Sequence, residues 1–154
     1  MPGAGFYSIH TSKLTFRSNG RWYADEDPVV HERLARLFSR YVRRKLSGGY
    51  EIWIDARYHA DVEIEDTPYV VTVVDRDGAG QFTIELNDGT REVLNLDGLQ
   101  VGTNHVLYCG VKDGAERARF LRPAYYHLAT FIEEVGPGRF QLRCGGSTYP
   151  IVQL

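Results

Sequence analysis

The chain has few of the features that place a protein in a special structural class. Its 154 residues include only two cysteines, Cys109 and Cys144, which are too few and too far apart for a disulfide framework or a thiolate metal site. No apolar run approaches the roughly 18 residues that a membrane-spanning helix needs. Residues 1–6 lack the basic start and the following apolar stretch of a secretory signal. We therefore expect a cytoplasmic protein that does not enter a membrane.

The chain also lacks a strong excess of charge of one sign. Its formal net charge is −2, so it has no overall attraction to nucleic acid or to an anionic membrane, and any anion site must be local. The hydrophobic fraction of 43% and the charged fraction of 25% are those of an ordinary globular protein, which excludes a disordered chain. Internal repeats and low-complexity segments are absent from the sequence.

The first half begins with a predicted hairpin and a predicted helix. Ser18-Asn19-Gly20 separates two strand-like runs, and Asn-Gly is a strong hairpin signal. A helix is predicted to follow, with Asp27 as its N-cap and Pro28 at its first position. One apolar face recurs at helical spacing, and Ser47-Gly48-Gly49 is expected to end the helix. The residues of this face are Val30, Leu34, Leu37, Phe38 and Tyr41.

The rest of the chain indicates strands and a second helix. Residues 50–54 and 58–65 are predicted strands, and the second alternates apolar and polar residues with a period of two. Further strands are expected at 69–74, 81–86, 90–96, 105–111, 115–121, 140–143 and 148–152. A helix is expected between Pro123 and the break at Gly136-Pro137-Gly138.

This order of elements predicts an α+β protein. We expect two small subdomains packed together, each with antiparallel strands and one main helix. The N-terminal subdomain covers residues 1–98 and contains the hairpin, the first helix and the meander. The C-terminal hairpin-helix-hairpin subdomain covers residues 99–154, although no change of composition marks a linker between them.

Several segments together resemble a known family. They are Asn19-Gly20-Arg21-Trp22-Tyr23, Asp27-Pro28-Val29, Leu34-Ala35-Arg36-Leu37-Phe38, Gly49-Tyr50, the stretch 62–70, Tyr108, the stretch 118–126, Gly145-Gly146 and Tyr149-Pro150. They are similar to the bacterial domain-of-unknown-function family numbered 1285, over nearly the whole chain. The resemblance implies a small α+β protein with no established activity.

The family's most specific motif is only partly present. Glu65-Asp66-Thr67-Pro68-Tyr69 fits its Glu-Asp-x-Pro-aromatic stretch. The family usually places a threonine-proline-valine-glutamate segment before this stretch, where this chain has Asp55-Ala56-Arg57-Tyr58. A role for that glutamate therefore cannot be carried over.

A basic stripe is the first candidate functional surface. Five arginines would fall within about a third of the circumference of the first helix. They could neutralise the phosphates of a nucleotide or a nucleic acid. We favour a solvated helix face instead, because no glycine-rich phosphate loop accompanies the stripe and the net charge is negative. The arginines are Arg33, Arg36, Arg40, Arg43 and Arg44.

A polar strand face is the second candidate. His59, Asp61, Glu63 and Glu65 alternate along one strand, with Asp66 beside them. Such groups can hold a divalent cation or supply an acid and a base. Alternate side chains of one strand lie about 7 Å apart, so a compact site would need ligands from elsewhere. We favour the wet side of a half-buried strand, and expect no catalytic residue, no metal and no cofactor here.

Together these observations favour a ligand-binding, partner-binding or regulatory module. We expect a cleft between the two halves that takes a small anionic ligand or a protein partner, in a monomer or a homodimer. Its predicted lining is Trp22, Tyr50, Trp53, Arg36, Arg40, Arg43, Glu65 and Asp66. Two alternatives stay open: a small enzyme that uses the carboxylates of strand 59–66, and a nucleic-acid-binding protein that uses the arginine stripe, which we disfavour. An enzyme needs convergent titratable groups in one pocket, whereas a binding module needs only a basic or aromatic one.

Overall fold

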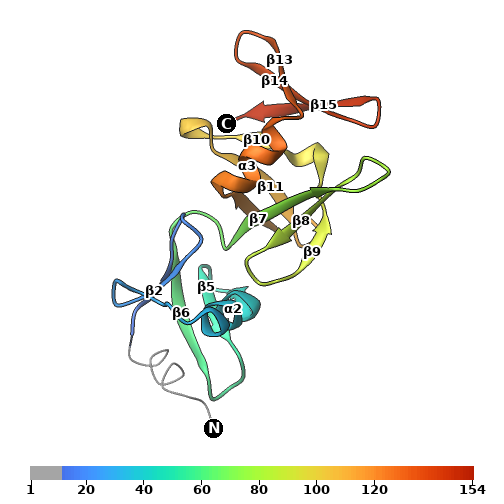
Figure 1. Cartoon of the computed structure of the whole chain (residues 1–154). Helices are drawn as coiled ribbons and strands as arrows, with labels where there is room; N and C mark the ends of the chain where they lie inside the picture. Colours follow the sequence, from blue (N-terminus) through green and yellow to red (C-terminus); the bar gives the residue numbers. More distant parts are fainter. Residues whose placement is uncertain (1–11) are drawn as a thin grey trace. The chain divides into compact units, whose positions relative to one another are not determined.

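The computed structural model describes residues 12–154, and in it the chain divides into two compact units (Figure 1). The first unit ends at Pro68 and the second runs from Tyr69 to Leu154. This division falls earlier than the boundary at residue 98 that we expected from the sequence, because residues 69–93 form three strands of the second unit's sheet. Residues 1–11, which include the segment inspected for a secretory signal, lie outside the described part of the chain.

The first unit is a six-stranded sheet with one α-helix, in the strand order β3-β2-β1-β6-β5-β4. The strands are β1 Leu14–Phe16, β2 Trp22–Ala24, β3 Asp27–Pro28, β4 Val42–Arg44, β5 Tyr50–Trp53 and β6 His59–Ile64, and the helix is α2 Glu32–Tyr41. The predicted Asn19-Gly20 hairpin joins β1 to β2. β1 and β6 run parallel, so the sheet is mixed rather than purely antiparallel as we expected.

Helix α2 begins later than the sequence indicated. Asp27 and Pro28, the predicted N-cap and first helical residue, form β3 and pair with β2. The N-cap is His31, whose Nδ1 accepts a hydrogen bond from the Leu34 amide at 3.3 Å. Val30, which we expected on the apolar helix face, is therefore outside the helix and 84% exposed.

The helix also ends earlier than predicted. It stops at Tyr41, and Val42 enters β4, where it pairs with Ile52. Valine is stiff at χ1 and favours a strand, and both valine and its partner are buried, so sheet pairing replaces the last predicted turn. Gly48 and Gly49, with φ of 97° and 76°, form the β4–β5 hairpin turn instead of a helix stop.

An aromatic cluster forms the core of the first unit. The rings of Phe16 and Trp22 lie 5.0 Å apart, and Phe38 of α2 meets Trp22 edge-on at 5.7 Å. All three are at most 1% exposed. Trp22 Nε1 donates a 2.9 Å hydrogen bond to Ser39 Oγ, so its one polar atom is satisfied inside the core. This cluster packs α2 against the sheet of the first unit.

The second unit is a nine-stranded mixed sheet with one α-helix, in the order β13-β14-β15-β10-β11-β12-β7-β8-β9. The strands are β7 Tyr69–Arg76, β8 Phe82–Leu86, β9 Arg91–Val93, β10 Gln100–Val101, β11 Leu107–Val111, β12 Glu116–Phe120, β13 Ile132–Gly136, β14 Arg139–Cys144 and β15 Ser147–Gln153. Two short 3₁₀ turns, η1 Leu96–Gly98 and η2 Thr103–His105, flank β10. Helix α3, Arg122–Ala129, packs on β7.

Helix α3 is shorter than expected. Pro123 lies at its start, as predicted, but residues 132–136 form β13 rather than the end of the helix. Strands in two sheets with two α-helices confirm the α+β class for residues 12–154. Among these residues, no helix combines the length and the apolar character needed to cross a bilayer.

Candidate binding sites

All eight residues that the sequence suggested for ligand binding lie in the first unit. Trp22 is 1% exposed and belongs to the aromatic core, so no ligand can reach it. Tyr50 is half-buried, and the guanidinium of Arg44 lies 5.1 Å from its ring. Trp22 and Tyr50 therefore both contribute to packing within the first unit.

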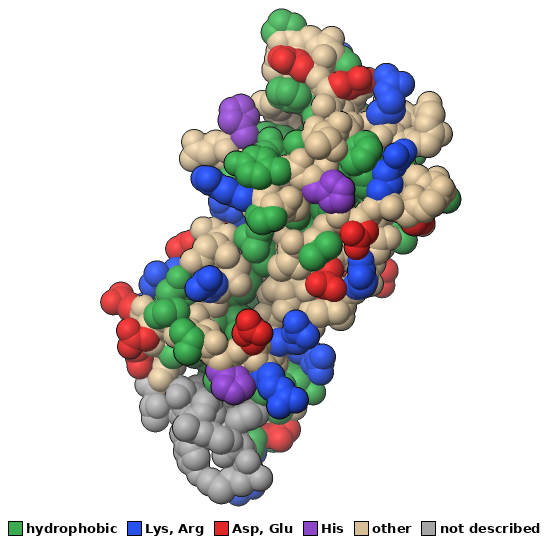
Figure 2. All heavy atoms as spheres, viewed as in Figure 1, with side chains coloured by type: hydrophobic (Ala, Val, Ile, Leu, Met, Phe, Trp, Pro, Cys, Tyr) green, Lys and Arg blue, Asp and Glu red, His purple; other side chains and the backbone are tan. Residues whose placement is uncertain are grey.

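The predicted arginine stripe is divided between two elements. Arg33, Arg36 and Arg40 are exposed on α2, but Arg43 and Arg44 lie in β4. Successive residues of a strand point to opposite faces, so the last two arginines leave the helix surface in different directions. Acidic and basic side chains are interspersed on the face of the molecule drawn in Figure 2. The helical stripe thus has three arginines instead of five.

Two of the predicted residues, Arg43 and Trp53, do meet in the first unit. The guanidinium of Arg43 lies 4.4 Å from the Trp53 ring, and its Nε pairs with Glu51 at 2.8 Å. The Trp53 ring in turn stacks on His59 at 4.4 Å. Arg43 is thus already held by a carboxylate and a ring, which satisfies its charge without a ligand.

The alternating strand β6 has the wet and dry sides that its sequence predicted. His59, Asp61 and Glu63 are exposed, and the residues between them are half-buried. Lys45 pairs with Asp61 at 2.9 Å, and Lys13 lies 3.3 Å from Glu63. These carboxylates bind neighbouring lysines rather than converging on one point.

The side chain of Glu65, which follows β6, is also bound by a residue of the first unit. Glu65 Oε1 accepts the Ser18 amide at 2.8 Å, and Asp66 follows it as an exposed residue. Between residues 12 and 154, no three histidine, cysteine or acidic side chains are grouped so that they could hold a metal ion.

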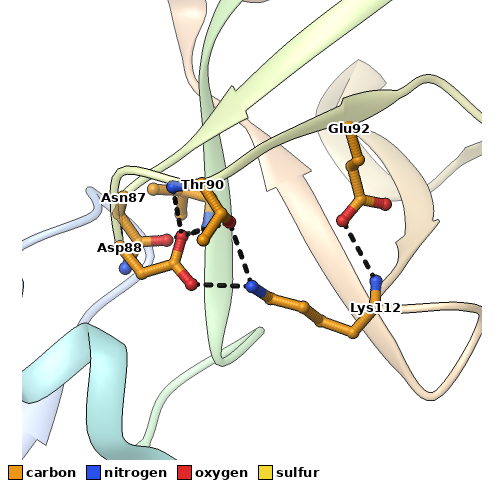
Figure 3. Close-up of polar contacts among 6 residues, drawn as sticks. Asn87, Asp88, Thr90, Glu92 and Lys112 are labelled. Carbon is orange, nitrogen blue, oxygen red and sulfur yellow. Dashed lines mark hydrogen bonds and ion pairs between the residues drawn. The ribbon is translucent and has the colours of Figure 1, made fainter.

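A buried ion pair in the second unit was not foreseen from the sequence. Asp88 lies in the β8–β9 turn, where its side chain is 5% exposed, and Lys112 Nζ reaches its Oδ2 at 2.7 Å (Figure 3). Thr90 completes the group by donating its hydroxyl to Asp88 Oδ1 at 2.6 Å, while its oxygen accepts from Lys112 at 3.0 Å. The expected strands 81–86 and 90–96 imply a turn at residues 87–89, but a turn does not reveal a distant lysine.

The environment of this pair shifts two pKa values. Burial alone would raise the pKa of Asp88, but the hydrogen bonds from Lys112 and Thr90 outweigh it and hold the pKa below its ordinary value. Burial, helped by the Asp88 charge, raises the pKa of Tyr69 to about 12. The Tyr69 ring lies 4.9 Å from Lys112 Nζ. The network joins two turns and a strand, and its satisfied partners indicate a structural role.

A basic and aromatic cavity of about 330 Å³ is the strongest candidate site in the second unit. Its walls come from the end of β7, from the segment after α3, and from the β14–β15 turn. The lining residues are Arg76, Thr130, Phe131, Ile132, Glu133, Arg143, Gly145 and Gly146. A neighbouring open cavity of about 470 Å³ shares Gly145. Of the residues between 12 and 154 that line it, Asp97 is the only Asp, Glu, Lys, Arg or His.

Arg76 lines this cavity and is exposed to solvent. Its guanidinium carbon lies 4.9 Å from the Phe131 ring centre and 5.9 Å from that of Phe82. The two rings meet edge-on at 5.1 Å. In residues 12–154, no carboxylate forms an ion pair with Arg76. An aromatic pair therefore orients the guanidinium while its donors stay available.

The second arginine of the cavity is paired. Arg143 Nη2 lies 2.9 Å from Glu133 Oε1, an oxygen that also accepts from the Gln141 side chain. These hydrogen bonds, first from Gln141 and then from Arg143, lower the pKa of Glu133. Two guanidinium groups and one carboxylate give the cavity a local charge of about +1 at neutral pH. Because the whole chain has a net charge of −2, an anion site must be local, and this cavity has such a local positive charge.

No pattern in the amino-acid sequence predicts this cavity. More than fifty residues separate Arg76 from Phe131, and twelve separate Phe131 from Arg143. The three residues share no motif. They meet because Cys144 at the end of β14 reaches the β7–β8 turn, where its Sγ lies 3.1 Å from the Gly80 carbonyl oxygen. Such a juxtaposition depends on the register of the whole sheet.

Comparison with known proteins finds similarity at the level of the fold. No family model matches the sequence, and no curated protein matches it significantly. Two solved structures are similar in fold, and both are DUF1285 family proteins. One, from Silicibacter pomeroyi DSS-3, is 19% identical, with a TM-score of 0.71 over 99% of this chain and 90% of that one. The other, from Shewanella baltica OS155, is 16% identical, with a TM-score of 0.60 over 78% of this chain and 92% of that one. These matches confirm the resemblance to the DUF1285 family at the level of the fold.

Proposed function

We propose that this chain is a DUF1285-type binding module that takes a small anionic ligand in the cavity beside Arg76, and that it is not an enzyme. The observation that carries the proposal is a guanidinium oriented by two aromatic rings and lacking a carboxylate partner among the described residues. A carboxylate or phosphate can accept two parallel hydrogen bonds from such a fork.

The Arg76 guanidinium also lies close to the backbone of Gly80. Gly80 has φ of 84°, and a Cβ added there would lie 3.3 Å from Arg76 Nη2. A side chain at residue 80 would therefore crowd the guanidinium as well as strain the backbone. A preformed donor costs little ordering entropy when a ligand binds, which favours a binding role.

The ionisable groups of the cavity favour binding over catalysis. A general acid or base works best with a pKa near the working pH. Glu133 has a pKa below the ordinary carboxylate value, so it is a poor proton acceptor at neutral pH. The remaining charged groups are arginines, which do not exchange protons at neutral pH. The cavity has the basic and aromatic character that we expected of a binding module.

A thermal-shift screen tests the proposal directly. Inorganic phosphate, sulfate, succinate and phenyl phosphate are compared with the neutral analogues succinamide and phenol at constant ionic strength. A ligand that binds only the folded chain raises its melting temperature with concentration. We expect at least one anion to do so and the neutral analogues to have no effect. Equal shifts with anionic and neutral compounds, or none at all, would reject the proposal.

A protein partner is the second candidate. Leu46 at the tip of the β4–β5 hairpin is fully exposed, and Val30 is 84% exposed in the same unit. Exposed apolar side chains of this size can mark a contact surface, although single ones are common. We propose a cytoplasmic monomer or homodimer. Sedimentation of the wild type and of Leu46→Asp tests this: a dimer that dissociates in the variant would assign the surface to self-association.

A further inference from the structure

Another cavity, also of about 330 Å³, lies between α3 and the part of the sheet where β10 pairs with β15. Its wall is mostly apolar and includes Leu107, Ala129, Ile132, Phe140 and Ile151. Leu107 and Ile151 are at most 6% exposed, so the inner part of the wall belongs to the core. Of all its lining residues, this cavity shares only Ile132 with the Arg76 site, so each site can be tested without the other.

Three polar side chains line the same cavity: His105, Tyr125 and Glu134. They come from η2, from α3 and from β13. His105 and Glu134 are exposed and Tyr125 is half-buried, so the polar groups stand where the cavity meets solvent. An apolar interior with a few polar groups at its mouth is the usual composition of a small-molecule site, and its volume is at the lower end of such sites.

The backbone at His105 is strained. Asn104 and His105 have φ of 58° and 59°, in the left-handed region. Asparagine and histidine are enriched in this region among residues other than glycine, but each still costs more there than glycine would. Glycine would remove the strain at residue 105 and with it the imidazole ring. Strain of this kind is often kept where it places a functional side chain.

We propose that this cavity binds a small amphipathic molecule, with its apolar body against Leu107 and Ile151 and a hydrogen-bond-donating end at His105 and Glu134. Among the described residues of the wall, Glu134 is the only charged group of definite sign, so it favours a hydroxyl or a protonated amine and disfavours a carboxylate. The left-handed backbone at residue 105 serves to hold the imidazole at the mouth.

Calorimetric titration of the full chain with butanol, pentanol and hexanol tests the apolar part. Affinity is expected to rise about four-fold for each added methylene, which corresponds to the transfer of one such group from water. Hexylamine, hexanol and hexanoate test the polar end, and we expect the amine and the alcohol to bind more tightly than the acid. No saturable binding, or tightest binding of hexanoate, would overturn the proposal.

Filling the cavity tests its location. Ala129→Leu places a larger side chain inside it and should abolish hexanol binding. Tyr126→Leu is the matched control, since Tyr126 lies on the same helix, is 61% exposed and does not line the cavity. Hexanol binding that survives Ala129→Leu, or that is lost equally in both variants, would contradict the assignment.

Two glycine variants separate function from structure at the mouth, and they remain informative if Ala129→Leu does not fold. Asn104→Gly and His105→Gly each relieve a left-handed backbone, so both should keep or raise the melting temperature. Only His105→Gly should lower the affinity for hexanol, by about five-fold, because one hydrogen bond is lost. A lower melting temperature for His105→Gly, or unchanged hexanol affinity, would show that the ring is structural or uninvolved.

Discussion

Lys112 Nζ lies 2.7 Å from Asp88 Oδ2, and this pair connects the turn after β11 to the turn after β8. The two turns belong to strands that are separated in the sheet by β12 and β7. Lys112 and the neighbouring Asp113 have φ of 55° and 57°, so the hairpin adopts a left-handed backbone here. The ion pair and the Lys112 amide, which donates to Glu92 Oε2 at 3.3 Å, stabilise that conformation.

We predict that Asp88→Asn lowers the free energy of unfolding by about 2–3 kcal/mol, because a largely buried charge-assisted hydrogen bond is lost and Lys112 keeps its charge. Asp75→Asn is the matched control, since Asp75 pairs with Arg91 in the same sheet at about half exposure. That variant should cost less than about 1 kcal/mol. Urea denaturation of both measures the difference, and equal costs would show that burial of the Asp88 pair adds nothing.

The same pair predicts a pH dependence. The pKa of Asp88 is lowered in the folded state, so its contribution is complete above the unfolded value of about 3.9 and is lost as the pH falls through the folded pKa. The stability gap between wild type and Asp88→Asn should therefore be constant from pH 7 to 5 and shrink below about pH 4. Urea titrations at pH 7, 5 and 3 measure this stability gap. A gap that widens in acid would contradict a lowered pKa of Asp88 in the folded state.

The two cysteines should differ in reactivity. Burial, and to a smaller extent the charge of Glu92, raises the pKa of Cys109 to about 12, and the side chain is 1% exposed. Its thiolate is therefore scarce at pH 8. We predict that the native chain exposes one reactive thiol to a disulfide reagent, that Cys144→Ser exposes none, and that the unfolded wild type exposes both. Rapid labelling of native Cys144→Ser would show that Cys109 is accessible.

The polar side of β6 should bind no metal. His59, Asp61 and Glu63 are each engaged with a ring or a lysine of the same unit, and they do not converge. We predict no saturable isotherm when magnesium, manganese, zinc or calcium is titrated calorimetrically. A stoichiometric isotherm that disappears in His59→Ala or Asp61→Ala would make this face a metal site and reopen the alternative of a small enzyme.

The parts of the fold that depend on local patterns were predictable. Asn19-Gly20, the alternation in β6 and the helix start at Pro123 each have a short-range cause, and each was found. The errors came where sheet pairing competed with a helical signal. Pro28 suits a first helical position but pairs in β3, and the run after Tyr41 pairs with β5.

The candidate sites could not be predicted from the sequence, because they too depend on how distant strands pair. The predicted cleft residues all lie in one unit, and several are core or paired side chains. Arg76 carries no motif, and its position against Phe131 follows from the contact between the β7–β8 turn and the end of β14. The left-handed backbone at His105 could not be predicted either, because only a few per cent of residues other than glycine have a positive φ, even though histidine is enriched among them.

The measurement that tests the central claim most directly is calorimetric titration of the best anion from the thermal-shift screen into wild type, Arg76→Gln and Arg139→Gln. Arg139 is an exposed arginine of β14 outside the cavity, so it controls for the loss of one positive charge. Removing charge-assisted hydrogen bonds worth about 1.5–3 kcal/mol should weaken binding by about 10- to 150-fold in Arg76→Gln, while Arg139→Gln stays within about two-fold of wild type. Equal affinities for all three proteins would contradict the assignment of Arg76 as the anion-binding residue.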